Sequence, residues 1–380
     1  MKIMFDETSK REWPIREVNV EDLLGRSSVQ FSQNELDKLI CNRTILVTGG
    51  GGSIGSGIVR QLIMAGVKKL IVFDMNENDS YVLFQELRPV LRNKNQLIIE
   101  VGSMADARCV DHLYAKYRPE IVFHAAAHKH VPLMEHCPCE AVKNNIFGTY
   151  NLLRAAHNAK CRKFVLISTD KAVNPTNIMG ATKRYCEDMM CAFAKKIGNQ
   201  TDFVSVRFGN VLGSHGSVIP IFQMQIARGG PVTITDRRMT RYFMTIPEAT
   251  GLVIRAAAMA RCSETFILDM GEPVKIIELA ENLIRLSGYE PYRDIPITEV
   301  GLRPGEKLYE ELLVNDEEHI ATTDSKIFIE RNNLNLSMYT LEGQLYKLRS
   351  AVELTDNQMV LDLMRQYIPG FHNPEKVMAG

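Results

Sequence analysis

The run RTILVTGGGGSIG, residues 43–55, constrains the fold more than any other stretch of this chain. A short apolar, β-branched segment ends in glycines and leads into SIGSGIVRQLIMAG, whose apolar residues recur at helical spacing. Glycine permits a tight turn and a close backbone approach, and the N-terminus of the following helix attracts a pyrophosphate. A strand, a glycine loop and a helix in this order predict a dinucleotide-binding unit.

The second apolar strand, KKLIVFDMN, carries Asp74, which lies 19 residues after Gly55. A carboxylate at this place can bond the ribose hydroxyls of adenosine. The same carboxylate repels a 2′-phosphate, so Asp74 favours NAD as the cofactor and leaves NADP open.

Apolar strands continue to alternate with helical stretches through QLIIEVG, RPEIVFHAAA and CRKFVLIST. This alternation predicts an α/β fold with a doubly wound parallel Rossmann sheet, and a smaller C-terminal substrate-binding lobe where the pattern becomes irregular. The predicted divisions are an N-terminal extension or linker (1–42), the NAD-binding domain (43–206), a substrate lobe with some elements returning to that domain (207–320), and a helical C-terminal tail (321–380).

Charge and cysteine content argue against several classes of function. The chain has 45 basic and 45 acidic residues and no basic stripe with interleaved aromatics, so we expect no nucleic-acid binding. It contains no run of about 18 apolar residues, so we expect no membrane insertion by this chain. Its eight cysteines lack paired spacing and follow no signal peptide, which favours a reducing cytoplasm.

The stretch STDKAVNPTNIMGATKR, residues 168–184, carries the candidate chemistry. Thr169, Asp170 and Lys171 come at the end of the strand VLIST, and ligands of doubly wound folds bind at the carboxyl ends of strands. A Ser or Thr here, followed by Tyr-x-x-x-Lys, is the arrangement of short-chain dehydrogenases. Met179 stands four residues before Lys183, at the position of the tyrosine, and a thioether performs no acid–base chemistry.

With the glycine loop, the chain resembles the extended short-chain dehydrogenases, and most closely the bacterial polysaccharide-biosynthesis nucleotide-sugar 4,6-dehydratases. The resemblance covers about residues 14 to 370 and rests on TGGGGSIGS, HAAAHKHVPLME, KNNIFGT, STDKAVNPTNIMGATKR, RFGNVLGSHGSVIP, MTRYFMTIPEA and GLRPGEKLYEELL. One subgroup, the large UDP-N-acetylglucosamine 4,6-dehydratases, carries methionine in place of the tyrosine, so the resemblance makes Met179 a subgroup marker. The implied reaction oxidises C4 of the sugar, eliminates water across C5 and C6, and returns the hydride to C6. It feeds surface glycan or glycoprotein synthesis, and retention at C5 is expected.

The resemblance also implies roles for residues of the site. Asp170 is the expected general acid at O6 and Lys171 the base at C5. Thr169 orients the C4 hydroxyl, Lys183 bonds the nicotinamide ribose, and Asn145 holds a water or a backbone contact near that lysine. The expected cofactor-binding residues are Gly49, Gly52, Ser53, Ile54, Gly55, Asp74, Ala125, Ala126 and Lys183. The expected residues for the UDP-sugar, UDP-N-acetylglucosamine, are Lys129, His130, Asn210, Ser217, Val218, Thr233, Arg241, Arg303 and Glu306.

Two requirements of this chemistry concern protons. Lys171 must be neutral to act as a base, which needs a pKa lowered by burial or by nearby positive charge. Because Met179 is inert, our hypothesis is that Asp170 accepts the O4 proton, through Thr169 or water, and later delivers a proton to O6.

A cluster of imidazoles and thiols suggests zinc at first sight, but the spacings H-x3-H-x-H and C-x-C form no familiar pair-and-pair site. We therefore expect no metal here. The residues concerned are His124, His128, His130, His136, Cys137 and Cys139.

Several functional alternatives stay open at this stage. They are a nucleotide-sugar 4-epimerase, a dehydratase that inverts C5, and an NAD-binding regulator without catalysis. The family resemblance implies self-association, so we expect a homo-oligomer. We also expect a cytoplasmic protein, either soluble in itself or the soluble part of a membrane-anchored one.

Overall fold

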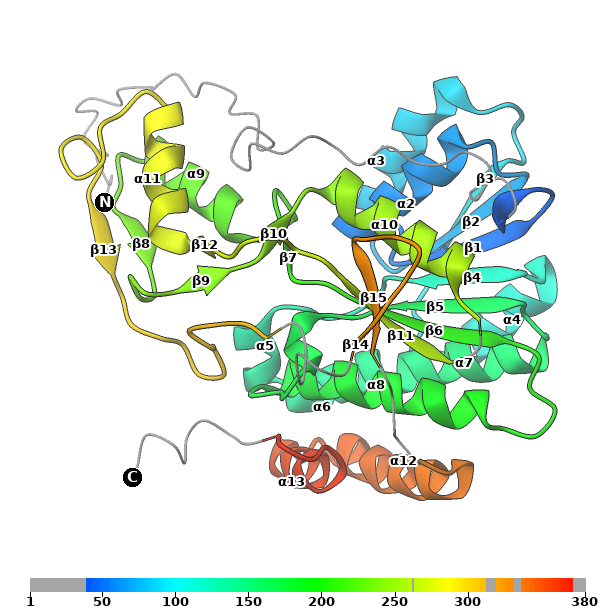
Figure 1. The fold of residues 1–380 in the computed structure, drawn as a ribbon. Helices are drawn as coiled ribbons and strands as arrows, with labels where there is room; N and C mark the ends of the chain where they lie inside the picture. The colour runs from blue at the N-terminus through cyan, green and yellow to red at the C-terminus, as the bar shows by residue number, and fades with distance from the viewer. Residues whose placement is uncertain (1–38, 262, 312–318, 331–335, 372–380) are drawn as a thin grey trace, which may run out of the picture.

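The computed structural model describes residues 39–261, 263–311, 319–330 and 336–371, and the predicted N-terminal extension lies almost entirely outside them. The core of the molecule is a nine-stranded sheet in the order β14-β15-β11-β6-β5-β4-β1-β2-β3 (Figure 1). The strands from β3 across to β11 pair in parallel, whereas β15 and β14 are antiparallel at one edge. The predicted α/β fold with a doubly wound parallel sheet is confirmed, because the order 3-2-1-4-5-6 is that of a dinucleotide-binding fold.

The strands of this sheet are short and apolar. Those at its centre, such as β5 with the sequence KFVLI, are buried along their whole length, as expected for parallel strands covered on both faces. The bounds are β1 (Thr44–Thr48), β2 (Lys69–Asp74), β3 (Leu97–Val101), β4 (Ile121–His124), β5 (Lys163–Ile167), β6 (Asp202–Arg207), β11 (Glu264–Leu268), β14 (His319–Ala321) and β15 (Ile327–Glu330).

Helices cover both faces of the sheet (Figure 1). One face packs against α2 (Ser53–Met64), α3 (Glu77–Leu87) and α10 (Ile246–Met259) in one apolar cluster. The other packs against α4 (Ala107–Tyr117), α7 (Gly148–Asn158) and α8 (Ile178–Ala194). The C-terminal helices α12 (Met338–Glu353) and α13 (Asn357–Tyr367) form a further layer outside α8 and join the same cluster. Shorter helical segments are η2 (Arg88–Val90), α5 (Val131–His136), α6 (Pro138–Ala141), the π-helix η3 (Val142–Phe147) and η4 (Asp170–Ala172).

A smaller lobe stands beside the carboxyl ends of the parallel strands and has an apolar cluster of its own. Its two helices pack over three short two-stranded pairings, β10 with β7, β12 with β9 and β13 with β8. Its elements are β7 (Asn210–Val211), α9 (Val218–Ala227), β8 (Val232–Ile234), β9 (Thr240–Arg241), β10 (Phe243–Met244), β12 (Val274–Lys275), α11 (Ile276–Leu286) and β13 (Ile297–Glu299).

The observed helices and strands can be compared with the predicted domain bounds. These bounds themselves stay a prediction. Within 207–320, α10 and β11 pack with the central sheet, while the other elements up to β13 form the lobe. Within 321–380, α12 and α13 are helical as predicted for a tail, and β15 precedes them as a strand of the main sheet.

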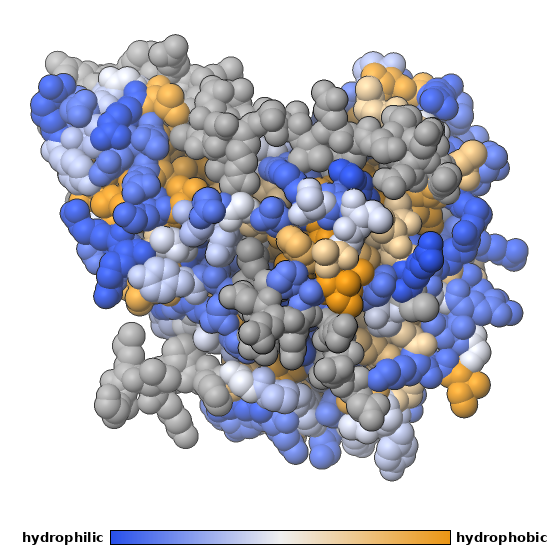
Figure 2. Space-filling model, viewed as in Figure 1, coloured by the Kyte–Doolittle hydropathy of each residue, from blue (hydrophilic) through white to orange (hydrophobic). Residues whose placement is uncertain are grey.

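The hydropathy of the surface bears on what the molecule can contact. Figure 2 shows a mainly hydrophilic face on which apolar side chains lie in small separate groups. Among the described residues, none of the helices is both long and apolar enough to cross a bilayer.

Candidate active site

Two cavities open near the carboxyl ends of the parallel strands, and the loop that follows β4 contributes to both. The first has a volume of about 320 Å³ and contains most of the predicted cofactor residues. It is lined by Gly49, Gly52, Phe73, Asp74, Met75, Asn76, Asp79, Gly102, Ser103, Met104, Ala125, Ala126, Ala127, His128 and Asn144.

The glycine loop is built so that no side chain fits within it. A Cβ on Gly55 would lie 2.0 Å from the carbonyl oxygen of Gly49. Gly49 itself has φ +67°, and a Cβ there would lie 2.5 Å from the backbone nitrogen of Ala126. The loop leads into α2, whose N-cap residue Gly52 makes no side-chain cap, so the first N–H groups of the helix are left for an anion.

The carboxylate of Asp74 is held at the end of β2 by two backbone N–H groups. Gly51 donates to Oδ2 at 2.9 Å and Asn76 donates to Oδ1 at 2.9 Å. Each carboxylate oxygen keeps further acceptor capacity toward the cavity. The glycine cradle, the uncapped helix and this carboxylate together fit the diphosphate and adenosine ribose of a dinucleotide.

Two other predicted cofactor residues have different contacts. The hydroxyl of Ser53 accepts the N–H of His215 at 3.0 Å, which ties the loop before α9 to the glycine loop. Ile54, in the first turn of α2, is half-buried and packs against the apolar cluster on that face of the sheet.

Thr169, Asp170 and Lys171 lie together just after β5, as the sequence predicted for a strand end. The Thr169 hydroxyl donates to Asp170 Oδ1 at 2.8 Å, and the Lys171 ammonium donates to the same oxygen at 3.0 Å. Asp170 is only 1% exposed, and its Oδ2 has no hydrogen-bond partner among the described residues. A buried carboxylate with one oxygen unpartnered is a place where a proton can be accepted.

The charge state of Lys171 differs from the expectation for a base. Burial lowers the pKa of this ammonium, but the carboxylates of Asp170 and Glu310 outweigh burial and raise it above its ordinary value. The Nζ atom lies 3.2 Å from Glu310 Oε1 and donates to Asn210 Oδ1 at 3.3 Å. The neutral form that a base requires is therefore disfavoured in the protein without substrate, because the neighbouring carboxylates hold the proton on Lys171.

Met179 and Lys183 lie one turn apart on α8. Met179 is buried in the apolar cluster beneath the helix, where it packs and does not titrate. Burial also lowers the pKa of Lys183, and the ammonium has no hydrogen-bond partner in the part of the chain that the structure describes. Lys183 is not among the residues that line either cavity.

Asn145 contacts the backbone of the loop after β4 from inside the π-helix. Its Oδ1 accepts the N–H of His128 at 2.8 Å, and its Nδ2 donates to the carbonyl of His128 and to Thr182 Oγ1, both at 3.1 Å. The amide therefore joins the loop after β4 to α8, one residue before Lys183. Single turns of π-helix are common at functional sites.

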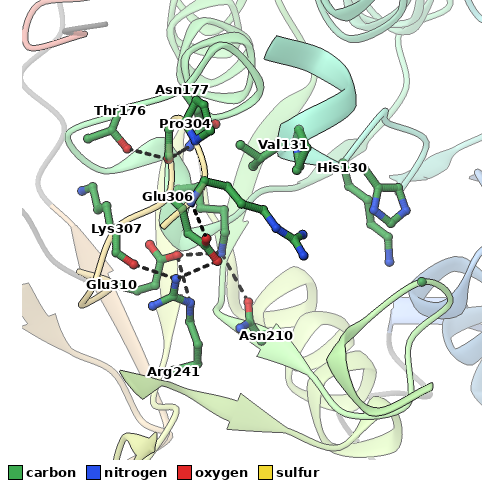
Figure 3. Close-up of a pocket in the computed structure, with 16 residues that line it drawn as sticks. His130, Val131, Thr176, Asn177, Asn210, Arg241, Pro304, Glu306, Lys307 and Glu310 are labelled. Atoms are coloured by element: carbon green, nitrogen blue, oxygen red, sulfur yellow. Dashed lines mark hydrogen bonds and ion pairs between the residues drawn. The ribbon is translucent and has the colours of Figure 1, made fainter. Parts of the chain in front are cut away.

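The second cavity, with a volume of about 250 Å³, lies between the lobe and the end of β5 (Figure 3). It gathers six of the predicted substrate residues and five cationic side chains against two carboxylates, which suits a diphosphate. It is lined by Lys129, His130, Val131, Pro132, Lys171, Thr176, Asn177, Asn210, Gly216, Arg241, Arg303, Pro304, Gly305, Glu306, Lys307 and Glu310.

Arg241 and Glu310 are buried in the wall of this cavity. Arg241 donates to the carbonyls of Thr240, Lys307 and Leu308 at 2.7 to 3.0 Å, so it holds the segment that contains Glu306 and Glu310. Figure 3 shows Glu306 and Glu310 converging on this guanidinium.

Sequence reasoning missed Glu310, Lys307, Thr176 and Asn177. The signal for Glu310 was a carboxylate four residues after Glu306 in GEKLYEE.

Three predicted substrate residues are not among those that line the cavity. The Thr233 hydroxyl accepts from the side-chain amide of Gln225 at 2.7 Å, so it joins β8 to α9. Val218 packs in the lobe cluster at the start of α9. Ser217 is the N-cap residue of that helix, and its Oγ is buried without a partner among the described residues.

The His124 imidazole, one of those that suggested zinc, is held by two hydroxyls. His124 is fully buried between the hydroxyls of Thr48 and Thr149, at 2.7 and 2.9 Å, and burial holds the pKa of this imidazole well below its usual range. Within the described ranges, no group of three or more His, Cys, Asp or Glu side chains is placed to hold a metal ion.

The family model described as polysaccharide biosynthesis protein matches residues 45–332, and this chain belongs to that family. The "Probable polysaccharide biosynthesis protein EpsC" of Bacillus subtilis is 52% identical over 87% of this chain and 55% of its own length. The capsular polysaccharide biosynthesis protein CapD of Staphylococcus aureus is 51% identical over 83% of this chain and 52% of its own length. The chain thus spans about half the length of these two relatives. A UDP-glucose 4-epimerase of Rickettsia rickettsii is 32% identical over 80% of this chain and 89% of its own.

Solved structures have a similar fold. Pen from Bacillus thuringiensis is 36% identical, with a TM-score of 0.71 over 79% of this chain and 90% of that one. A DesIV double mutant (dTDP-glucose 4,6-dehydratase) from Streptomyces venezuelae, with NAD bound, has a TM-score of 0.63 at 21% identity, over 81% of this chain and 97% of its own. At that identity the likeness shows the fold alone.

Proposed function

We propose that this chain is an NAD-dependent UDP-N-acetylglucosamine 4,6-dehydratase that retains the configuration at C5. The product is the 4-keto-6-deoxy sugar, UDP-2-acetamido-2,6-dideoxy-hexos-4-ulose. The observation that carries the proposal is the joined set Thr169, Asp170 and Lys171, which supplies an acid and a base beside a cationic cavity. An oxidation alone needs no such second pair.

The residues of the first cavity fit NAD, which supplies a hydride acceptor at C4 and a hydride donor at C6 when it is bound. The Asp74 carboxylate and the N-terminus of α2 would hold the adenosine ribose and the diphosphate. Lys183, buried and without a hydrogen-bond partner among the described residues, would bond the nicotinamide ribose. Asp74 favours NAD over NADP by its charge.

Asp170 takes over the work of the missing tyrosine in this proposal. The Thr169 hydroxyl already donates to Asp170 Oδ1, so an O4 proton can pass through that hydroxyl to the carboxylate. The Asp170 carboxyl then delivers a proton to O6 as the C6–O bond breaks. One carboxyl acts first as base and then as acid, and protons are conserved.

Lys171 removes the C5 proton in the middle step, after its ammonium has released a proton to solvent, and it returns a proton to C5 in the last step. Protonation of Asp170 cancels one of the two carboxylate charges that hold the Lys171 proton on, so the first step prepares the second. The negative charge that forms at O4 as C5 loses its proton lies beside the cationic wall of the cavity.

The second cavity supports a UDP-sugar as substrate. Arg303, Lys129 and Lys307 offer charges to the diphosphate, and Asn210 and Glu306 offer hydrogen bonds to the sugar or ribose. Arg241 shapes this wall by holding its backbone.

Single-turnover absorbance of bound NADH tests the role of Asp170. The Asp170→Asn variant keeps the shape of the side chain but accepts no proton, so we expect formation of NADH to slow by about 10²–10⁴-fold. Thr169→Val, which breaks only the link to O4, should slow the same phase by less. A normal rate in Asp170→Asn would rule out this assignment.

A nucleotide-sugar 4-epimerase is the second candidate, favoured by the similarity to the Rickettsia enzyme. Epimerisation leaves the 6-hydroxyl in place, so a product without a C6 methyl group would identify it. A dehydratase that inverts C5 would give a product of opposite configuration at that carbon, and a regulator would bind NAD without turnover. Cytoplasmic location and self-association are part of our proposal and rest on the family resemblance.

A further inference from the structure

Glu310 stands between the candidate base and the arginine of the cavity wall. Its Oε1 atom lies 3.2 Å from Lys171 Nζ and 3.5 Å from Arg241 Nε, and its side chain is only 4% exposed. The carboxylate is therefore shielded from water and shared by two cations. None of the proposed catalytic steps has yet used it.

The surroundings of Lys171 show what this carboxylate does. The three oxygens near the ammonium are Asp170 Oδ1 at 3.0 Å, Asn210 Oδ1 at 3.3 Å and Glu310 Oε1 at 3.2 Å. The Asp170 and Asn210 oxygens accept hydrogen bonds from the ammonium, and the Glu310 carboxylate forms an ion pair with it. Glu310 is the one that comes from the far wall of the cavity.

We propose that Glu310 is a positioning residue that holds the Lys171 ammonium beside Asp170 and sets the pH at which Lys171 gives up its proton. The inference rests on the proposed dehydratase function and deepens it. In the resting protein the held ammonium donates to the same Asp170 oxygen that accepts the Thr169 hydroxyl. Once Asp170 is protonated, Glu310 is the remaining anion at Lys171, so it decides when that lysine becomes a base.

Charged groups of both signs surround Lys171. Asp170 on its own segment and Glu310 across the cavity favour the charged form, while Arg241 on β9 disfavours it. The remaining ionisable groups that line the cavity are Lys129, His130, Arg303, Glu306 and Lys307. In Glu310→Gln, only the Asp170 carboxylate would still favour the charged form of Lys171, so Lys171 would lose its proton at lower pH.

The direct test is NMR titration of the lysine side chains in ligand-free protein, with Lys171→Arg used to assign the signal. In the unaltered chain we expect Lys171 to stay charged beyond the ordinary lysine value of 10.5. In Glu310→Gln the midpoint should fall by about 1–3 pH units, the usual effect of one nearby opposite charge. If this variant does not fold, Glu310→Asp is used in its place. It keeps the carboxylate but moves it farther from Lys171, so it should give a smaller shift of the Lys171 midpoint in the same direction.

Glu306→Gln is the matched control. It removes the same charge from the same cavity, and Glu306 lies 3.8 Å from Arg241 Nη2, but no direct contact joins it to Lys171 in the described structure. The Lys171 midpoint should therefore stay within about 0.5 pH unit in this variant. Equal shifts in both variants would overturn the proposal, because the total charge of the cavity, and not the contact with Glu310, would then determine the pKa of Lys171.

A second test uses the reaction itself. It follows the exchange of the sugar C5 proton with D₂O as a function of pH. In Glu310→Gln the rising limb of the exchange profile should move to lower pH. A loss of rate that is equal at every pH would mean that Glu310 serves only the fold of the wall through Arg241, and the proposal would fail. If the lysine midpoint shifts but the unaltered chain gives no dehydrated product, the proposed function fails while the role of Glu310 at Lys171 stands.

Discussion

A buried ion pair beneath the catalytic segment offers a test of the structure that needs no substrate. Arg207 is fully buried and donates two hydrogen bonds to Glu187, at 2.8 and 2.7 Å. The Ser168 hydroxyl, next to Thr169, donates to the same carboxylate at 2.6 Å, and Arg207 also pairs with Glu330 at 2.7 Å. The pair thus joins α8 to the ends of β5 and β6. We predict that Glu187→Gln strongly destabilises the protein.

The magnitude follows from burial. Breaking a buried ion pair by removing one partner costs about 3–5 kcal/mol, because the other charge is left without compensation. Glu330 remains beside Arg207, so we expect the low end, about 3 kcal/mol. At roughly 2 °C per kcal/mol for a large domain, the midpoint of thermal unfolding should fall by about 6 °C.

The Arg60–Glu86 pair is the control, since its two hydrogen bonds, both 2.7 Å, have the same bidentate geometry at the surface. Glu86→Gln should cost about 1 kcal/mol or less, because water screens an exposed pair. Urea unfolding of both variants gives the comparison. If Glu187→Gln lowers the free energy of unfolding no more than Glu86→Gln does, the buried network does not stabilise the strand ends as we argue.

The contribution of this network to the stability of the protein should also change with pH, in a direction that follows from the pKa of Glu187. Burial raises the pKa of this carboxyl, but Arg207 outweighs burial and holds it below its ordinary value. A carboxyl with a depressed folded-state pKa stabilises the protein above its unfolded value, and that stability is lost as the pH falls. Glu187→Gln should therefore destabilise the protein less in acid than at pH 7.

Two further predictions concern single residues. Gly55→Ala should weaken NAD binding at least about tenfold in calorimetry, since its Cβ would meet the Gly49 carbonyl at 2.0 Å, while Gly52→Ala, at 3.3 Å, should do less. Burial raises the pKa of Asp188 to about 7 from 3.8, so this carboxyl lowers stability as the pH rises through that range. Asp188→Asn should accordingly be more stable than the unaltered chain at pH 8 and similar to it near pH 4; equal gains at both would contradict the assignment.

The sequence predicted what is local in the chain. The strand, the glycine loop and the helix follow one another within residues 43–64, and Asp74 closes the next strand, so their geometry is encoded in order and spacing. The same holds for Thr169, Asp170 and Lys171 at the end of β5.

Contacts between distant segments could not be predicted in the same way. Glu310 reaches Lys171 only because the segment after β13 folds back across the cavity, and there it adds to the neighbouring Asp170 carboxylate in raising the pKa of Lys171. Thr233 looked like a polar residue of the pocket, but the edge of β8 uses it to bond Gln225. In both cases a polar side chain has several possible partners, and only the three-dimensional arrangement selects one.

Proton NMR of the purified protein with UDP-N-acetylglucosamine in D₂O tests the central claim most directly. We predict a new C6 methyl signal, deuterium at C5 with retained configuration, and the former H4 at C6, without added NAD⁺. A bound UDP-sugar that keeps its 6-hydroxyl would contradict the dehydratase assignment. A protein that binds no UDP-sugar would make Met179 the mark of a chain that no longer catalyses the reaction.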